Sequence, residues 1–469
     1  MKTHWLFAAV AGIFAAAAPL AGPGGGAAFA QSGHDLRSGR RVGDVDQVQI
    51  LLEVGGDLLE EASDGGVQKN PMKVVGEFRY HEKTLQLPGE GDKPGRSVRS
   101  YETAVGVIKT EAVGLKVTLP AERRVLVVEA EPPDVTVFSP RGRLTGEQLD
   151  LVDFLGNTLL LDHLLPPKPV AVNGRWQLPE SVVAGLLRMD ALRTGSMGCT
   201  LTEVNDTLAR FQISGSAQGL RAGASTHVDV KGKFRLDRTR RRIDWFALLM
   251  KENRDLGPVE AGIDAVVRLQ VVIKPKVPFD GLADAELQGL PLESTPELRQ
   301  LFYESADGDW QLVRDRRWQN VSKKGQERSV LPLRMIDQGQ YLAHCNVSLL
   351  PKRPAAKPVE LAEFQADVER ALGDRFGEFI EAGQFHSDAD YRVYRVVALG
   401  KVDDRPVRWT YYLITDRDGR QAALAFSVEG EHVERFGEAD RELVNGFRFL
   451  PGKAPTQAAA KTEPEAKRQ

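Results

Sequence analysis

Residues 226–237, THVDVKGKFRLD, decide the fold class, because they hold the strictest two-residue period in the sequence. Apolar or small residues alternate there with polar ones, as in a strand that packs one face on a core and turns the other to water. A basic turn at 238–241 and the stretch RIDWFALLMKE at 242–252 predict a return strand. A third alternating stretch, 265–273, extends this hairpin into a β-meander.

Strand patterns also fill the chain before the meander, interrupted once by helical spacing. Thr145 is a candidate helix cap, and Leu155 and Leu159 belong to an apolar stripe that ends near Leu165 before a proline-rich stretch. Pro179 opens a second short helix. The remaining expected strands are 48–54, 73–80, 101–107, 115–119, 124–129, 135–138, 198–204 and 208–214.

This order predicts an α+β fold that starts with a curved antiparallel sheet, either a half-barrel or a sandwich, over residues 45–274. The sheet has more apolar faces than two short central helices can cover, so it must curl over itself or be plugged by them. The arrangement resembles the half-barrel of the LolA/LolB-type lipoprotein carriers. That resemblance implies an apolar cavity closed by short helices.

A proline-containing linker at 275–300 is expected to lead to a second domain at 301–450. Apolar residues at helical spacing predict a helix over 359–382, and a final helix is expected over about 431–445. The segments WTYYLITDRDGRQAALAFSV (409–428) and ERFGEADRELVNGFRF (434–449) resemble the closing hairpin and helix of the PsbP-like family. The resemblance implies an α/β/α sandwich that serves as a binding or assembly module.

Both ends of the chain are expected to lie outside the folded part. Lys2, an apolar run from Trp5 and the Ala28-Phe29-Ala30 site have the layout of a signal peptide over 1–30, so we expect export to the periplasm or the medium. Retention of this segment as an anchor is the alternative. Residues 31–44 and the tail 451–469 are polar and predicted to be disordered.

Composition excludes some classes of partner. Apolar residues make up 42% of the chain, and the net charge is -3 with 27% charged residues, which gives no indication of nucleic-acid binding. After residue 30 no apolar stretch reaches the roughly 20 residues of a membrane span. We therefore expect no transmembrane segment in the mature chain.

The two cysteines, Cys199 and Cys345, leave two interpretations open. In an oxidising compartment they could form a disulfide that closes a long loop. Separate buried thiols are the alternative.

No catalytic, metal or cofactor signature stands out. The histidines are scattered, and adjacent His344 and Cys345 would point to opposite faces of a strand. No nucleophile elbow has the right spacing. Two basic clusters, at 238–242 and at 314–317, are interpreted as a solvated turn and as arginines packed beside indoles.

These observations favour a non-catalytic exported binding or carrier protein for a lipid or another apolar ligand. Phe234, Trp245, Val267, Leu155 and Leu159 are the predicted lining of an internal pocket. In this hypothesis the C-terminal domain docks to an envelope protein. A purely structural or assembly protein of the cell envelope is one alternative, and a hydrolase whose carboxylates meet only on folding is another.

Overall fold

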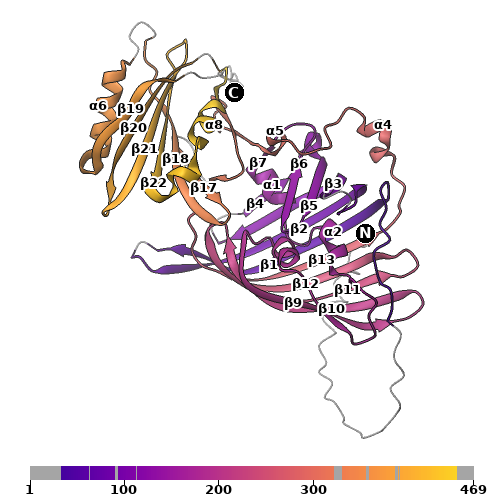
Figure 1. The fold of residues 1–469 in the computed structure, drawn as a ribbon. Helices are drawn as coiled ribbons and strands as arrows, with labels where there is room; N and C mark the ends of the chain where they lie inside the picture. Colours follow the sequence, from indigo (N-terminus) through magenta and orange to yellow (C-terminus); the bar gives the residue numbers. More distant parts are fainter. Residues whose placement is uncertain are drawn as a thin grey trace, which may run out of the picture.

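The computed structural model describes residues 33–451 except 63, 90–92, 112–113, 322–329, 355–358, 386–388 and 390. The predicted signal peptide and nearly all of the predicted C-terminal tail lie outside the described residues. Strands predominate, and the fold is built on three sheets (Figure 1).

The largest sheet has 12 strands in the order β6-β5-β3-β2-β1-β13-β12-β11-β10-β9-β8, with β4 paired to β3. All of its pairings are antiparallel, which confirms the sheet predicted from the two-residue period. The strands are β1 (Val45–Glu61), β2 (Val67–Gln86), β3 (Gly95–Thr110), β4 (Gly114–Thr118), β5 (Val125–Glu131), β6 (Asp134–Phe138), β8 (Arg175–Gln177), β9 (Ala191–Val204), β10 (Leu208–Arg221), β11 (Ala224–Asp237), β12 (Arg242–Arg254) and β13 (Gly262–Lys274).

Short helices cover the inner face of this large sheet (Figure 1). They are α1 (Gly146–Val152), α2 (Thr158–Leu161), the 3-10 turn η2 (Asp162–Leu164) and α3 (Glu180–Leu187). The predicted cap is confirmed, because the Thr145 hydroxyl accepts from the Gln148 amide at 3.2 Å and the Gln148 side chain accepts from the Thr145 amide at 3.1 Å. The single helix expected to reach Leu165 is wrong: Gly156 adopts φ +76° and Asn157 caps a new helix.

Trp245 lies on the outer face of the large sheet, which corrects its expected inward position. A register shift at Arg235/Leu236 in the β11–β12 pairing changes the phase of the alternation. Phe246 therefore points inward and is fully buried, whereas Trp245 lies opposite Arg235 and Val272 on the outer face.

The stretch expected to be a free linker packs against the outer face of β3, β5 and β6. It forms η3 (Asp280–Leu282), α4 (Asp284–Leu287) and α5 (Pro296–Arg299). Leu282 and Leu287 join Val98 and Val127 in a small separate core. Both faces of β5 are thus buried, which explains its uninterrupted VLVV sequence.

Residues 33–44, predicted to be disordered, lie along the large sheet. His34 forms a β-bridge with Val170, and Leu36 is buried in the main core. The Arg40 guanidinium is also buried, where Nε donates to Asp162 at 2.8 Å. These contacts hold a segment that composition alone marks as polar.

A four-stranded sheet, β23-β15-β14-β7, joins the two halves of the chain. Its strands are β7 (Leu144–Thr145), β14 (Leu301–Glu304), β15 (Trp310–Arg314) and β23 (Phe447–Phe449). β14 pairs with β7 in parallel, and β15 pairs with the last strand of the chain. Residues 301–314 thus pair outside the C-terminal sheet, which the sequence did not predict.

The C-terminal sheet has seven strands in the order β16-β17-β18-β22-β21-β20-β19. Helix α6 (Leu361–Leu372) packs on one face through Phe364 and Val368, while α7 (Val433–Phe436) and α8 (Ala439–Asn445) pack on the other. The strands are β16 (Trp318–Asn320), β17 (Val330–Asp337), β18 (Gln340–Leu350), β19 (Phe376–Phe385), β20 (Arg392–Val402), β21 (Arg405–Thr415) and β22 (Gln421–Glu429). Single 3-10 turns occur at η1 (Ala121–Arg123), η4 (Gly373–Arg375) and η5 (Gly430–His432).

Two predicted helices of this part are shorter than expected. The helix predicted to reach residue 382 ends at Leu372, because Gly373 adopts φ +56° and the chain continues as edge strand β19. The closing helix is divided at Gly437, which adopts φ +57°. In both places a glycine permits a backbone turn that other residues rarely make.

Candidate functional site

The centre of the inner face is a packed core rather than a pocket lining. Four of the five predicted ligand-contacting residues, Leu155, Leu159, Phe234 and Val267, are buried in the main core. The Phe234 ring stacks on Phe211 with centroids 4.4 Å apart. Trp245, on the outer face, does not join them. The structure thus separates Trp245 from the other four residues, and the ligand-binding role of all five stays a prediction.

The two cysteines are free thiols in separate cores, so the disulfide hypothesis is wrong. Burial raises the pKa of Cys199 to about 12 and raises that of Cys345 as well. Both thiols therefore stay protonated and unreactive at neutral pH.

A fully paired group of charges lies at one end of the inner face. Glu82 is 1% exposed and accepts hydrogen bonds from Arg99 Nε at 2.8 Å and from the Thr158 hydroxyl at 2.8 Å. We call this group the Glu82 cluster; it consists of Arg40, Glu82, Ser97, Arg99, Asn157, Thr158 and Asp162. None of these seven described side chains leaves a buried polar atom without a partner. The cluster fastens α2 to β2 and β3.

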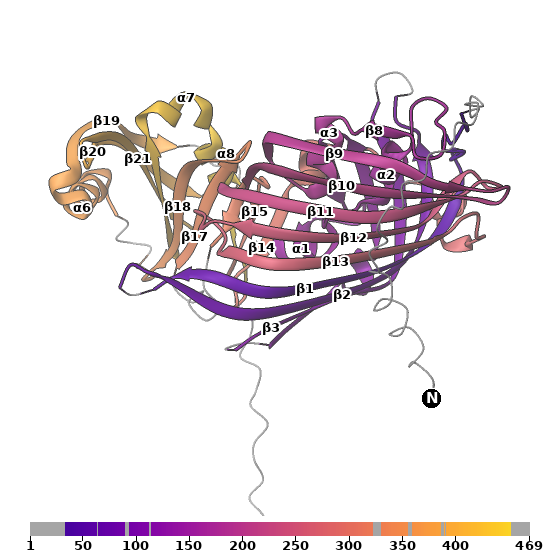
Figure 2. The ribbon, with the colours of Figure 1, turned by 90° about the horizontal axis from the view of Figure 1, so that it is seen from below.

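At the opposite end, the strands run on past the helices and leave apolar side chains partly exposed (Figure 2). Leu58 pairs with Ile263, and Ile108 lies between Val74 and Leu115 in the same inner layer. Helix α1 covers the edge of this surface, since a Cβ on Gly106 would lie 3.0 Å from Leu151. We call this surface the apolar floor; it consists of Leu58, Met72, Val74, Ile108, Leu115 and Ile263.

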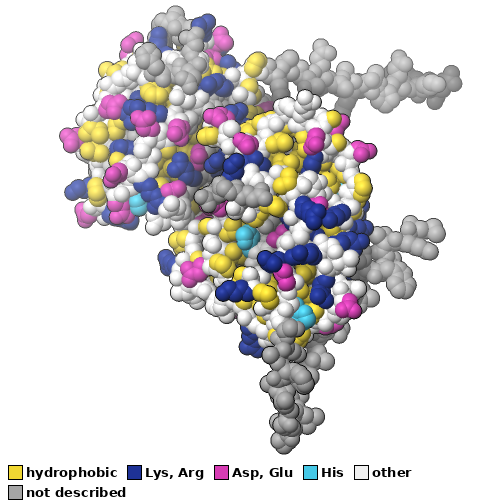
Figure 3. Space-filling model, turned by 45° about the vertical axis from the view of Figure 1, so that its right-hand side comes forward, with side chains coloured by type: hydrophobic (Ala, Val, Ile, Leu, Met, Phe, Trp, Pro, Cys, Tyr) yellow, Lys and Arg dark blue, Asp and Glu magenta, His cyan; other side chains and the backbone are white. Residues whose placement is uncertain are grey.

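Charged side chains from five parts of the chain converge beside the apolar floor. They come from α1 and the residue after it, and from the C-terminal end of α3. The others come from the C-terminal end of β10, from the C-terminal end of β12 with the loop to β13, and from β15. We call this group the junction cluster; it consists of Asp150, Asp153, Arg188, Asp190, Arg221, Glu252, Arg254, Glu260, Arg314 and Arg316. On the face in Figure 3, basic side chains also gather along the boundary between the two parts of the molecule.

The β12 side of the junction cluster continues directly from the apolar floor. Arg254 lies opposite Ile263 on the inner face and is 3% exposed. Glu252 is 4% exposed, and its Oε1 atom lies 3.6 Å from Arg221 Nη1 and 3.8 Å from Arg254 Nε. Both distances are too long for a hydrogen bond. These charges attract each other without pairing closely.

The turn between β17 and β18 packs against the β10–β11 hairpin. A Cβ on Gly339 would lie 2.9 Å from Leu220, and one on Gly223 would lie 3.2 Å from Ile336. The C-terminal sheet thus contacts the β10–β11 hairpin at the edge of the junction cluster.

The α1 side of the cluster holds carboxylates with raised pKa values. Although the Asp150 side chain is exposed to solvent, the protein around it and the charge of Glu260 raise its pKa to about 6, and Arg314 acts in the opposite direction. Burial also raises the pKa of Asp153, which pairs with Arg188. A carboxyl group that titrates near neutrality is sensitive to a second charge placed beside it.

Several buried polar atoms in the junction cluster have no hydrogen-bond partner. They are Glu252 Oε1, Arg254 Nε, and Arg314 Nε and Nη1. Buried polar atoms are almost always paired in folded proteins, and an unpaired one costs roughly 1 to 3 kcal/mol. Tyr101 Oη and Arg242 Nε lack a partner near the Glu82 cluster, but the unpartnered atoms of the junction cluster are more numerous and lie beside partly exposed apolar side chains.

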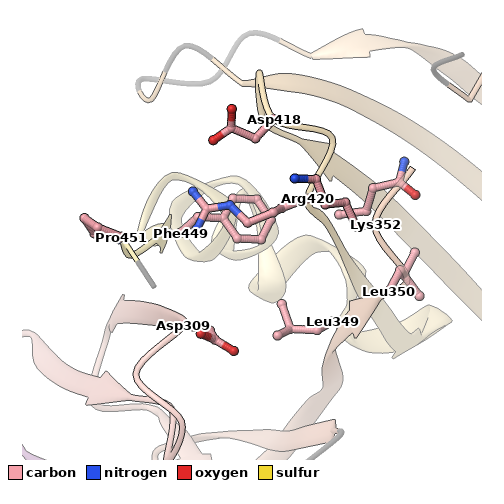
Figure 4. Close-up of a pocket in the computed structure, with 9 residues that line it drawn as sticks. Asp309, Leu349, Leu350, Lys352, Asp418, Arg420, Phe449 and Pro451 are labelled. Carbon is pink, nitrogen blue, oxygen red and sulfur yellow. The ribbon is translucent and has the colours of Figure 1, made fainter. Parts of the chain in front are cut away.

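A pocket of about 400 Å³ lies elsewhere, at the end of the C-terminal sheet (Figure 4). Leu349 and Leu350 line it with Lys352, Asp418 and Arg420. Arg420 is already engaged: its Nε donates to Asp416 at 2.6 Å, and its guanidinium lies over the Phe449 ring at 4.9 Å. The pocket therefore presents a paired cation and exposed leucines.

Two other kinds of feature are absent from the residues that the structure describes. These residues contain no group of three His, Cys, Asp or Glu side chains suited to hold a metal ion. Within the same ranges, no helix combines the length and hydropathy that crossing a membrane requires.

Of the residues of this site, sequence patterns singled out only the basic cluster at 314–317. Asp150 lies in α1, whereas Glu252 and Glu260 lie at the end of β12 and in the loop that follows, so the fold brings together two segments far apart in the chain. Glu252 and Arg254 do occupy inward positions of β12, where apolar residues would be expected. That break in the alternation is the signal that could have identified them.

Comparisons with known proteins do not assign a family. No family model and no curated protein matches the chain. Among solved structures, a protein from Bacteroides thetaiotaomicron has TM-score 0.23 and 8% identity over 32% of this chain and 48% of its own. Lipovitellin, described by its lipid–protein interactions, has TM-score 0.30 and 9% identity over 52% of this chain and 26% of its own. An outer membrane channel from Pseudomonas putida has TM-score 0.18 and 8% identity over 51% of this chain and 97% of its own.

The chain spans about half the length of the first of these structures and about a quarter of the second. The likenesses are too slight to establish a shared fold.

Proposed function

We propose that this protein is a non-catalytic binding or carrier protein that holds a lipid or another apolar ligand against the apolar floor. The observation that carries the proposal is the exposure of inward-facing apolar side chains where β1, β2 and β13 outrun the helices. Burying apolar surface contributes about 25 cal/mol per Å². An acyl chain laid along the floor would gain this contribution.

The junction cluster supports binding over catalysis. Its five arginines equal its five carboxylates in number, and among these described residues no nucleophile is hydrogen-bonded to a base. We propose that the C-terminal sheet with its helices forms a separate interaction domain. Export through the predicted signal peptide would place binding outside the cytoplasm.

Native mass spectrometry of gently purified protein, alone and with added dodecanoate or dodecanol, tests this function. The wild type should carry a bound molecule. Leu58→Glu should lose it, because the charge would stand on the floor. Leu51→Glu, on the outer face of the same strand, is the matched control and should keep it. A wild type that binds neither probe, or a Leu58→Glu variant that binds both unchanged, refutes the proposal.

A structural or assembly protein is the second candidate, favoured by the exposed Leu349 and Leu350 in the C-terminal pocket. In that case the purified protein would carry no bound molecule. Leu350→Glu would instead release the protein from the cell-envelope fraction, and Leu51→Glu would not.

A further inference from the structure

Arg314 is a buried cation whose hydrogen-bonding capacity is largely unused. The side chain is 6% exposed, and its Nε and Nη1 atoms have no partner. Burial lowers its pKa to about 10, against the attraction of Asp150 and Asp315, so the group is charged at neutral pH without full compensation. A guanidinium in this state is suited to bind an anion.

Three other arginines of the junction cluster are hydrogen-bonded or ion-paired within the protein. Arg316 Nη2 donates to the Val137 carbonyl at 2.6 Å. Arg188 pairs with Asp153, and Arg254 with Glu260. Arg221 is one-third exposed and lies 3.6 Å from Glu252, so within the described part of the cluster Arg314 is the deeply buried cation with the most unpartnered donors.

Helix α1 connects Arg314 with the apolar floor. At its start, a Cβ on Gly146 would lie 3.2 Å from Arg314 Nη2, so the guanidinium approaches the backbone there. Further along, Asp150 faces both Arg314 and Glu260, and Leu151 packs over β3 beside Ile108. A molecule lying along α1 would meet apolar side chains at one point and Arg314 at another.

We propose that the ligand is an anionic amphiphile, with a carboxylate or phosphate headgroup bound by Arg314 and its apolar chain on the floor. This inference rests on the proposed function and adds the chemistry of the headgroup. Two N–H groups of a guanidinium match two oxygens of either headgroup. Asp150 is the internal competitor, because it is the carboxylate that already compensates Arg314.

Calorimetric titration with three probes below their critical micelle concentrations tests the inference: dodecanoate, dodecyl phosphate and dodecanol. Charge-assisted hydrogen bonds correspond to about 10- to 100-fold in affinity. The wild type should bind the anionic probes at least about tenfold more tightly than dodecanol, and the tighter anion identifies the headgroup. Arg314→Gln should lose this preference and retain its affinity for dodecanol.

Two further variants keep the test decisive if Arg314→Gln fails to fold. Asp150→Asn should bind dodecanoate several-fold more tightly than the wild type, because it removes the competing carboxylate. Arg268→Gln, on the outer face of β13, should bind all three probes with the affinity of the wild type. A wild type that binds all three probes equally, or an Asp150→Asn variant with unchanged dodecanoate affinity, overturns the headgroup assignment and leaves the proposed function intact. Failure of the wild type to bind any probe overturns the proposed function itself.

Discussion

The two ends of the inner face of the large sheet carry buried charges in contrasting states. The Glu82 cluster is hydrogen-bonded throughout, and it ties α2 to the sheet. The junction cluster has long ion pairs and unpartnered atoms, and it lies beside apolar side chains that the helices leave partly exposed. The contrast teaches that a saturated buried network can fasten a helix to a sheet, whereas the binding surface that we propose lies where the network is unsaturated.

The largest expected change in the free energy of unfolding is at the Glu82 cluster. Glu82→Gln leaves Arg40 and Arg99 without their shared carboxylate, and it should lower the free energy of unfolding by about 3 to 5 kcal/mol. Equilibrium unfolding in urea measures this change. Glu53→Gln, on the outer face of β1, is the control and should stay within about 0.5 kcal/mol of the wild type. Equal losses in the two variants would remove the structural role assigned to the Glu82 cluster.

Truncating an apolar side chain should lower the free energy of unfolding more in α2, beside the Glu82 cluster, than on the apolar floor. Leu160, a fully buried residue of α2, should lower the free energy of unfolding by about 2 to 5 kcal/mol when it is replaced by alanine. Leu58, partly exposed on the floor, should cost about 1 kcal/mol or less. A Leu58→Ala variant as unstable as Leu160→Ala would show that the floor is part of a closed core.

The Glu82 cluster should also govern acid stability. Burial would raise the pKa of Glu82, but Arg99 and Arg40 together with their hydrogen bonds lower it to about 2, from 4.5. A carboxyl with a depressed pKa stabilises the fold above its unfolded value, and that stability is lost as pH falls through the folded value. Urea unfolding should therefore show a decline from about pH 4.5 towards pH 2 that Glu82→Gln makes shallower. Identical slopes in the two proteins would contradict the pairing.

The smallest change in the free energy of unfolding is expected at Asp150, whose ionisation lowers stability, whereas that of Glu82 raises it. The pKa of Asp150 is raised from 3.8 to about 6, so its ionisation opposes folding. Stability should rise slightly as pH falls from about 6 to 4, and Asp150→Asn should abolish this rise and be slightly stabilising at neutral pH. A destabilised Asp150→Asn variant would show that this carboxylate compensates Arg314 more than burial disfavours it.

Local patterns predicted the antiparallel strands of the large sheet, the Thr145 cap and helix α3, because each depends on residues close in sequence. They failed at Trp245, where a register shift reverses the faces of β12, and after Leu372, where a glycine ends a helix whose apolar period continues. The joining sheet and the junction cluster depend on pairings between distant segments, such as Leu301 with Leu144. No local pattern carries that information.

Ligand-induced stabilisation provides the most direct test of the central claim. Urea unfolding with and without saturating dodecanoate should show a gain in the wild type, since a ligand that binds only the folded state stabilises it. Glu82→Gln should unfold at a lower urea concentration than the wild type, yet dodecanoate should stabilise it by the same amount. Arg314→Gln should be about as stable as the wild type without ligand, but dodecanoate should not stabilise it. A gain preserved in Arg314→Gln, or lost in Glu82→Gln, would contradict the assignment of binding to one end of the sheet and fastening to the other.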